Sequence, residues 1–385
     1  QEVISQIISQ PRALMIVGVM LLLFGLVPGL PKFSFLLAAV AFGGVSWVIQ
    51  HQEPEEKSED EDLAEEPPEE SFEEVLHVDR LSLDLGYNLV GLVNAEDGGD
   101  LLDRIAGVRK QLCHELGLVM PSVRIRDDMS LAANEYCIKL KGAEVGRGEV
   151  FPRLLLAMAS DPTAEPIGGQ DAEEPVFGLP AKWIGPENRP VAEARGYTVV
   201  EPSTVIATHF SELVKSKAGE LLNRQDVQAL IERVRQHEPT VVTELIPEVA
   251  TIGHVQSVLR ALLVERVPIR DLATILEALA DAMRLTDDLE EATEIVRLAL
   301  ARTINEQYRQ RNKRIYAITV DPQVEAHIAE NTMKSLQGTV CAVDPAVLQQ
   351  MLRSANSAVE RTVARGHEPV ILASPGVRRH IRSLV

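Results

Sequence analysis

The chain has 385 residues and a formal net charge of −19, with 57 acidic and 38 basic side chains. This balance argues against a nucleic-acid partner, because phosphate binding needs a basic surface that the sequence lacks. The three cysteines are odd in number and are not spaced like those of a disulfide framework: Cys113, Cys137 and Cys341. This favours a reducing compartment, and therefore a cytoplasmic location for the large polar part of the chain.

Two apolar segments without charge lie near the start of the chain, at residues 13–30 and 33–49. Each is close to the ~20 apolar residues that a helix needs to cross a membrane. A signal peptide is the weaker alternative, because Arg12 alone supplies its basic region and the second segment follows at once. We expect residues 1–50 to be the end of a membrane domain with two transmembrane helices. Because the chain starts with Gln1 rather than Met, we expect it to belong to a longer protein.

An acidic run follows the apolar segments. Residues 53–74 contain 13 acidic side chains and one lysine. A segment with this charge cannot collapse into a core. The sequence therefore predicts a flexible linker over residues 51–76.

The rest of the chain is longer than one hydrophobic core usually serves. We predict a mixed α+β fold with α/β first and last subdomains, a small inserted α+β subdomain and an all-helical third subdomain. The predicted boundaries are 77–151 together with 202–222 for the first, 152–201 for the second, 223–306 for the third and 307–385 for the fourth.

Strands are expected mainly in the first two subdomains. Alternating apolar residues predict one or two strands in 78–94, another at 122–129, and a hairpin at 135–150 that turns near Gly142. The Gly/Pro-rich second subdomain shows little periodicity, and we expect one short strand at 196–202.

Two helices complete the first subdomain. The first, which should stop near Gly117, is predicted from apolar residues on one face: Leu101, Leu102, Ile105, Val108, Leu112 and Leu116. The second is expected to begin at Ser203 or Thr204 as its N-cap and to run to about Leu222.

The third subdomain shows clear amphipathic helices at 271–283 and 289–304, with 264–270 as its only short strand candidate. The fourth alternates between the two element types. Its expected elements are a strand at 314–320, a helix from Pro322, a helix at 345–365, a strand at 368–374 and a helix from Pro375. No closing strand follows, so we expect this subdomain to be truncated.

Motifs for catalysis, cofactors and metals are missing from the sequence. It contains no phosphate-binding P-loop, no H-x-x-x-H and no C-x-x-C pair. The glycines of KGAEVGRGE resemble a phosphate loop, but they lie in a hairpin and open no helix. We expect Cys113 to be a buried thiol beside an exposed His114. We therefore predict no enzyme activity, no cofactor and no metal site.

A hydrolase trio of Ser203, His209 and Glu201 is the catalytic alternative. No G-x-S-x-G elbow precedes the helix, and Ser203 stands where a helix cap is expected. A membrane-tethered hydrolase is thus the weaker interpretation.

The stretch EEPVFGLPAKWI, residues 173–184, carries aromatic side chains in a chain where aromatics are only 4% of residues. Phe177 lies in an irregular loop, and it can either tuck under that loop or stay available to a partner. The residues alone leave both possibilities open.

The following helix can be divided into faces by its period. Ile206, Phe210 and Leu213 should form its buried side, at 100° per residue. Thr208 then falls on the open side, and His209 at the boundary between the two.

Four separated motifs resemble those of the type III export-gate (FHIPEP) family: VRIRDDMSLAANEYCIKLKGAEVGRGE, EPVFGLPAKWI, GYTVVEPSTVIATH and VPIRDLATILEALAD. The resemblance covers nearly all of residues 80–306 and looks more flagellar than injectisome-like, although the injectisome branch stays the alternative. It implies an inner-membrane protein with a large cytoplasmic domain that assembles into a nine-membered ring. The implied partners are export chaperones with bound flagellar substrates, subunits of the ATPase complex and other export-gate membrane proteins.

The resemblance also implies a chaperone-binding dimple. The matching positions in this sequence are Glu174, where the family has Asp, together with Phe177 and Thr208. Leu179, Trp183 and His209 are the neighbours that we expect around them.

Overall fold

The chain divides into two units, Gln1–Val75 and Leu76–Val385. The computed structural model describes residues 78–94, 98–159, 165–335 and 338–384, all in the second unit. The predicted membrane segments and the acidic linker lie outside the described residues. Within the described ranges, no helix combines the length and apolar character needed to cross a membrane.

A four-stranded sheet with the order β2-β1-β3-β4 opens the described part. Its strands are β1 (Leu81–Leu85), β2 (Arg124–Asp127), β3 (Glu135–Leu140) and β4 (Ala143–Glu149). The pair β1–β2 is parallel and the other pairs are antiparallel. The predicted strand at 122–129 and the hairpin turning near Gly142 are confirmed. The segment after β1, however, forms the 3₁₀ helix η1 (Tyr87–Leu92) instead of a second strand.

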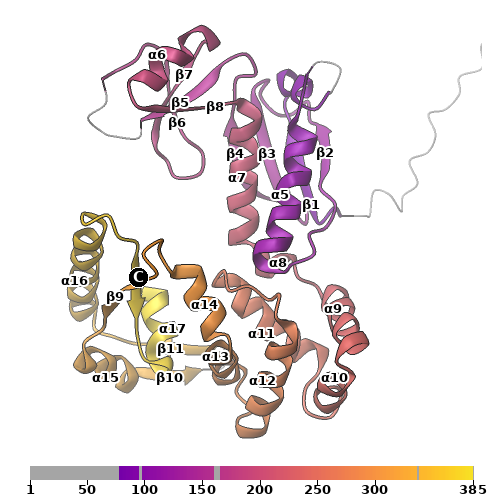
Figure 1. The fold of residues 1–385 in the computed structure, drawn as a ribbon, viewed down its shortest axis with the longest axis vertical. Helices are drawn as coiled ribbons and strands as arrows, with labels where there is room; N and C mark the ends of the chain where they lie inside the picture. The colour runs from indigo at the N-terminus through magenta and orange to yellow at the C-terminus, as the bar shows by residue number, and fades with distance from the viewer. Residues whose placement is uncertain (1–77, 95–97, 160–164, 336–337, 385) are drawn as a thin grey trace, which may run out of the picture. The chain divides into compact units, whose positions relative to one another are not determined.

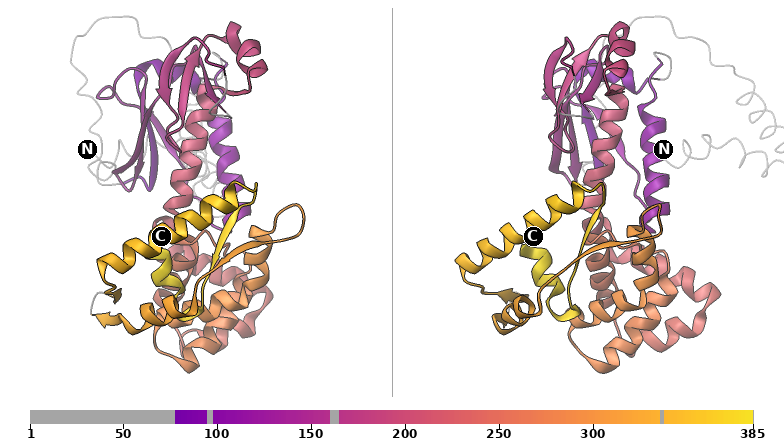
Figure 2. Two further views of the ribbon diagram at one scale, coloured as in Figure 1. Left: turned by 90° about the vertical axis from the view of Figure 1, so that its left-hand side faces the viewer. Right: turned by 60° about the vertical axis from the view of Figure 1, so that its left-hand side comes forward.

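Two helices, α5 (Leu101–Leu116) and α7 (Pro202–Ser216), lie side by side against one face of this sheet (Figures 1 and 2). Helix α5 ends at Gly117 as predicted, since this residue adopts the left-handed conformation with φ 78° and its N–H bonds to the carbonyl of Cys113. Leu102 and Cys113 were both predicted to be buried, and both are exposed. The apolar face of α5 is narrower than expected.

The inserted segment forms its own antiparallel sheet with the order β6-β7-β5-β8. Its elements are β5 (Leu155–Ala159), β6 (Gln170–Glu173), β7 (Pro180–Ile184), η3 (Pro186–Asn188), α6 (Arg189–Ala194) and β8 (Tyr197–Val200). Only β8 was predicted. The other strands are four or five residues long and are separated by segments with Gly and Pro, which leaves too little alternation to detect.

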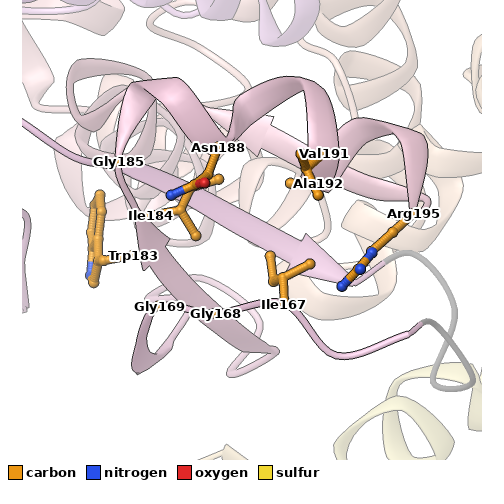
Figure 3. A pocket seen from close by; sticks show the side chains of 10 residues that line it. All are labelled: Ile167, Gly168, Gly169, Trp183, Ile184, Gly185, Asn188, Val191, Ala192 and Arg195. Atoms are coloured by element: carbon orange, nitrogen blue, oxygen red, sulfur yellow. The ribbon is translucent and has the colours of Figure 1, made fainter.

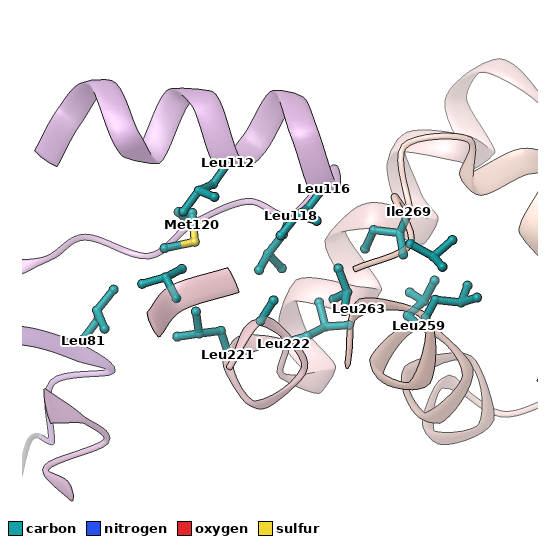
Figure 4. Packing of buried hydrophobic residues seen from close by; sticks show 14 of the residues in the cluster. Leu81, Leu112, Leu116, Leu118, Met120, Leu221, Leu222, Leu259, Leu263 and Ile269 are labelled. Carbon is teal, nitrogen blue, oxygen red and sulfur yellow. The ribbon is translucent and has the colours of Figure 1, made fainter. Parts of the chain in front are cut away.

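Helices alone form the next part, as predicted. They are α8 (Ala218–Leu221), α9 (Arg224–His237), α10 (Pro239–Leu245), α11 (Ile252–Val264), α12 (Leu272–Leu285), α13 (Leu289–Ala299) and α14 (Ala301–Tyr308). The strand candidate at 264–270 is not a strand. A continuous apolar core joins α5 and β1 to this helical part through the α8 region, as Figure 4 shows for Leu112, Leu116, Leu221, Leu259 and Leu263.

Strands and helices alternate again in the last part. Its elements are β9 (Tyr316–Thr319), α15 (Pro322–Glu330), β10 (Thr332–Ser335), β11 (Gly338–Cys341), α16 (Pro345–Val363), β12 (Pro369–Leu372) and α17 (Pro375–Leu384). Strands β9 and β12 pair in parallel, while the antiparallel pair β10–β11 was not predicted. The described chain is thus a mixed α/β structure. Its division into four subdomains stays a prediction.

Candidate partner-binding site

The turn between β6 and β7 presents Phe177 to solvent. The turn is closed by two backbone hydrogen bonds, from Glu174 N to the Leu179 carbonyl (2.8 Å) and from Gly178 N to the Glu174 carbonyl (3.0 Å). Gly178 has φ 65°, a conformation that glycine adopts without strain. The hairpin therefore ends in a turn of defined shape rather than in a loose loop.

Glu174 fixes this turn from the inside. Its side chain is only 6% exposed. One carboxylate oxygen, Oε1, accepts the Val176 N–H at 3.0 Å, and Oε2 accepts the Phe177 N–H at 2.7 Å. Hydrogen bonds from N–H groups to a carboxylate are stronger than neutral ones. Glu174, a predicted residue of the partner-binding site, therefore has both carboxylate oxygens engaged with the turn.

The ring of Phe177 is 69% exposed, and Leu179, on the same turn, is 47% exposed. Of the two possibilities that the sequence left open, the structure shows the available ring. Burial of an aromatic ring is strongly favourable, so an aromatic held in solvent on a fixed turn is typical of an interface anchor.

Helix α7 confirms the predicted faces. Ile206 and Phe210 are fully buried, Leu213 is half-buried and Thr208 is exposed. His209, which was predicted at the boundary, is only 6% exposed. Thr208 can therefore contact a partner through its side chain, whereas His209 cannot do so in this conformation.

The imidazole of His209 is paired inside the protein. The phenol oxygen of Tyr136, a fully buried residue of β3, lies 2.7 Å from His209 Nδ1. Burial lowers the pKa of His209, although the Glu174 carboxylate acts in the opposite direction. Tyr136 was not predicted as a site residue.

Trp183 is also internal, with 4% of its side chain exposed. Its ring contacts Phe151 edge to face, with the ring centroids 5.5 Å apart. Trp183, expected as a neighbour of the site, is thus turned into the core by the alternation of β7.

Two hollows adjoin the inserted sheet. One, of about 380 Å³, lies beside the turn and is lined in part by Gly148, Glu174 and Gly178 but not by Phe177. The other, of about 190 Å³, lies between α6 and β7 (Figure 3). Arg195 is the one ionisable residue in the lining of the second hollow, and it donates to the Pro166 carbonyl at 2.8 Å. This hollow therefore offers no acid–base pair.

A model of the FHIPEP family matches residues 1–385, the whole chain. The chain belongs to the FHIPEP family. The flagellar biosynthesis protein FlhA of Bacillus subtilis is 37% identical over 390 aligned residues that cover 100% of this chain and 58% of the relative. FlhA of Salmonella typhimurium is 35% identical, over 98% of this chain and 54% of its own length. This FHIPEP chain thus spans little more than half the length of the curated relatives it matches.

Solved structures share the fold of this FHIPEP chain. CdsV of Chlamydia pneumoniae superimposes with a TM-score of 0.68 at 25% identity, covering 83% of this chain and 91% of CdsV. The same protein in a complex with CdsO matches with a TM-score of 0.67 at 26% identity, over 80% of this chain and 90% of that chain. The nonameric SctV-C of EPEC matches with a TM-score of 0.63 at 20% identity, covering 80% of this chain and 90% of SctV-C. At this identity, the match shows a shared fold and nothing more.

The hydrolase trio is not assembled in this FHIPEP chain. Ser203 and His209 lie six residues apart on α7, a rise of ~9 Å along the helix axis, and Ser203 is buried. His209 Nδ1 is occupied by Tyr136. Across the described ranges, no group of three or more His, Cys, Asp or Glu side chains is arranged to hold a metal ion.

Proposed function

We propose that the chain is an export-gate component of a flagellar type III protein secretion apparatus. Its cytoplasmic part would dock export chaperones with their flagellar substrates and deliver those substrates to the membrane gate. Membership of the FHIPEP family and the FlhA relatives at 35–37% identity support this proposal.

The proposed docking surface consists of Phe177, Leu179 and Thr208. Exposure of Phe177 is the observation that carries this assignment, since 69% of its side chain is open to solvent on a turn that the Glu174 carboxylate holds. Glu174, Trp183 and His209 belong to the same site as internal supports rather than as contacts.

The larger assembly is also a proposal. We infer a nine-membered ring, because a protein of the same fold, SctV-C, is nonameric. We further infer contacts with subunits of the ATPase complex and with other export-gate membrane proteins. The complex of CdsV with CdsO supports a protein partner for this fold. The residues before 76 would anchor the chain in the bacterial inner membrane, with the large domain in the cytoplasm.

An injectisome export gate is the second candidate, favoured by the resemblance of the fold to CdsV. The flagellar assignment has the stronger support, because FlhA of Bacillus subtilis matches the chain from end to end at 37% identity, against 25% for CdsV.

Calorimetric titration of the purified 385-residue chain in detergent, with a flagellar export chaperone bound to its substrate, tests the proposal. We expect micromolar binding that weakens at least tenfold, or about 1.4 kcal/mol, in Phe177→Ala, because anchor residues dominate interface energies. Thr208→Ala should weaken it less, because it removes only a hydroxyl and a methyl group. Val191→Ala is the matched control, since Val191 is also apolar, exposed and part of the inserted segment.

The hydrolase alternative predicts a different pattern. Ester or peptide cleavage that disappears in Ser203→Ala would support it. Binding that is unchanged in Phe177→Ala would remove the basis of the docking proposal.

A further inference from the structure

Two glycines of β4 make room for side chains behind the proposed docking surface. A Cβ atom at Gly148 would lie 2.5 Å from the Tyr136 phenol oxygen and 2.7 Å from its Cζ. At Gly146, a Cβ atom would lie 2.2 Å from Leu213 Cδ1 and 3.3 Å from His209 Nε2. These are the glycines whose spacing resembled a phosphate loop. Their role in the fold is to let Tyr136 and α7 approach the strand.

The space is occupied by a hydrogen-bonded pair from two different elements. Tyr136 comes from the middle of the sheet, and His209 comes from the helix that covers it. Burial, together with the Glu174 charge, raises the pKa of the Tyr136 phenol, so the phenol stays neutral and its oxygen shares a hydrogen bond with His209 Nδ1. The rings meet nearly at right angles, with centroids 5.8 Å apart.

Glu174 lines the same hollow as Gly148, the glycine that lies against the Tyr136 phenol. Its charge acts on both Tyr136 and His209. At the same time it accepts the N–H groups of Val176 and Phe177. Three buried polar side chains, one each from β3, α7 and the β6–β7 turn, are therefore linked by a hydrogen bond or by charge.

The buried His209 and Glu174 are each linked through the backbone to one exposed residue. His209 follows Thr208 directly, and rotation of α7 about its axis would carry both side chains together. Glu174 holds the backbone of Phe177. A hydrogen bond that fixes the rotation of α7 against β3 also fixes where Thr208 lies with respect to the turn.

We propose that Tyr136 and His209 are positioning residues for partner docking, because their buried hydrogen bond locks α7 against β3 and thereby fixes the position of the exposed Thr208 on α7. This inference rests on the proposed docking function. It adds a pair that contacts no partner and yet determines the shape of the surface.

Tyr136→Phe tests the proposal with the removal of a single oxygen atom. We expect the chaperone–substrate complex, titrated against the full chain, to bind about tenfold more weakly to this variant. Tyr316→Phe is the matched control, because its hydroxyl also takes part in a hydrogen bond, with Asn312 at 2.9 Å, in the last part of the chain. That control should bind like the unchanged chain.

A double-variant comparison separates positioning from general destabilisation. If the pair acts through the surface, Tyr136→Phe should add less than a twofold loss once Phe177→Ala is present. An equal tenfold loss in both backgrounds would overturn the proposal. The proposal would also be overturned if Tyr136→Phe bound like the unchanged chain while Phe177→Ala bound weakly. That result would still support the docking function.

Hydrogen exchange gives a readout without any partner. Tyr136→Phe should raise the exchange rate of the α7 amides, and of the Val176 and Phe177 amides, at least fivefold. Gly148→Ala, a second variant that displaces the same phenol, should do the same. The exchange rate of the α13 amides should not change in either variant. Exchange that stays unchanged at these amides would contradict the proposal even if no chaperone binds. Failure of the unchanged chain to bind any chaperone, by contrast, would count against the docking function itself.

Discussion

The same segment of the chain gives Phe177 and Trp183 opposite environments. Phe177 sits on the turn and is 69% exposed, whereas Trp183, six residues later on β7, is 4% exposed against Phe151. The strand alternation that buries Trp183 stops at the turn, where Glu174 holds the backbone of Phe177 outward. Each ring should therefore affect a different property of the molecule.

Truncation of the two rings should separate stability from binding. We expect Phe177→Ala to change the free energy of unfolding by less than about 0.5 kcal/mol, as for other surface substitutions. Trp183→Ala should lower it by about 3–5 kcal/mol, because it removes a packed aromatic side chain. Urea denaturation of both variants measures the difference. A loss above about 2 kcal/mol in Phe177→Ala would show that its ring belongs to the core.

His209 should make stability depend on pH. Burial lowers its pKa below the ordinary value of 6.5. The folded chain then binds fewer protons than the unfolded chain between these two values, so stability falls as the pH drops through 6.5. We expect a decline from about pH 6.5 to 5, of at most about 1.4 kcal/mol per pH unit from this group.

His209→Gln should flatten part of that decline. His380 is also buried with a lowered pKa and should supply a second contribution that remains in the variant. Denaturation curves collected across this pH range for both proteins provide the measurement. Identical slopes would mean that His209 takes up its proton at the same pH in the folded and unfolded chains.

Helices with a regular spacing of apolar residues could be predicted from the sequence, whereas strands of four or five residues were mostly missed. The faces of α7 follow from its apolar spacing, so the exposure of Thr208 was predicted correctly. Strands β5, β6 and β7 were missed because each is only four or five residues long, which is too short for a clear alternation. The Tyr136–His209 pair spans 73 positions in the chain, and no local pattern reveals such a contact. The glycines at 146 and 148, two residues apart in a strand, were the available signal of a close approach.

Helix α17 is attached to the helical part by paired charges. Arg378 donates to both oxygens of Glu265, at 2.8 Å each, and to both oxygens of Glu294, at 2.9 and 2.5 Å. All three side chains are less than 20% exposed. Removal of this arginine would take away the ion-pair partner of Glu294, whereas Glu265 would keep Arg297 and Arg382.

Arg378→Met should therefore loosen α17. We expect a loss of about 3 kcal/mol in local stability, seen as faster hydrogen exchange of the α17 amides. Arg353→Met on α16 is the control, because Arg353 is exposed and bonds to the Gln349 carbonyl of its own helix. Equal exchange in both variants would show that apolar contacts alone, such as Val377 and Ile381 against Ile328, hold the helix.

At the scale of the whole molecule, the sequence motifs predicted the family, and the match over residues 1–385 confirms it. The mixed α/β character of the described part is confirmed as well. Which of the predicted site residues are exposed could not be predicted in full, because burial of Glu174 and His209 depends on contacts between the turn, β3 and α7. The membrane segments, the linker and the ring stay predictions.

Photo-crosslinking at the turn tests the central claim most directly. Phe177 would be replaced by benzoylphenylalanine in cells that build flagella, with the same replacement at exposed Val191 as the control. We predict that position 177 crosslinks to an export chaperone or its bound substrate, and that position 191 does not. Crosslinks to these partners from 191 but not from 177 would contradict the account.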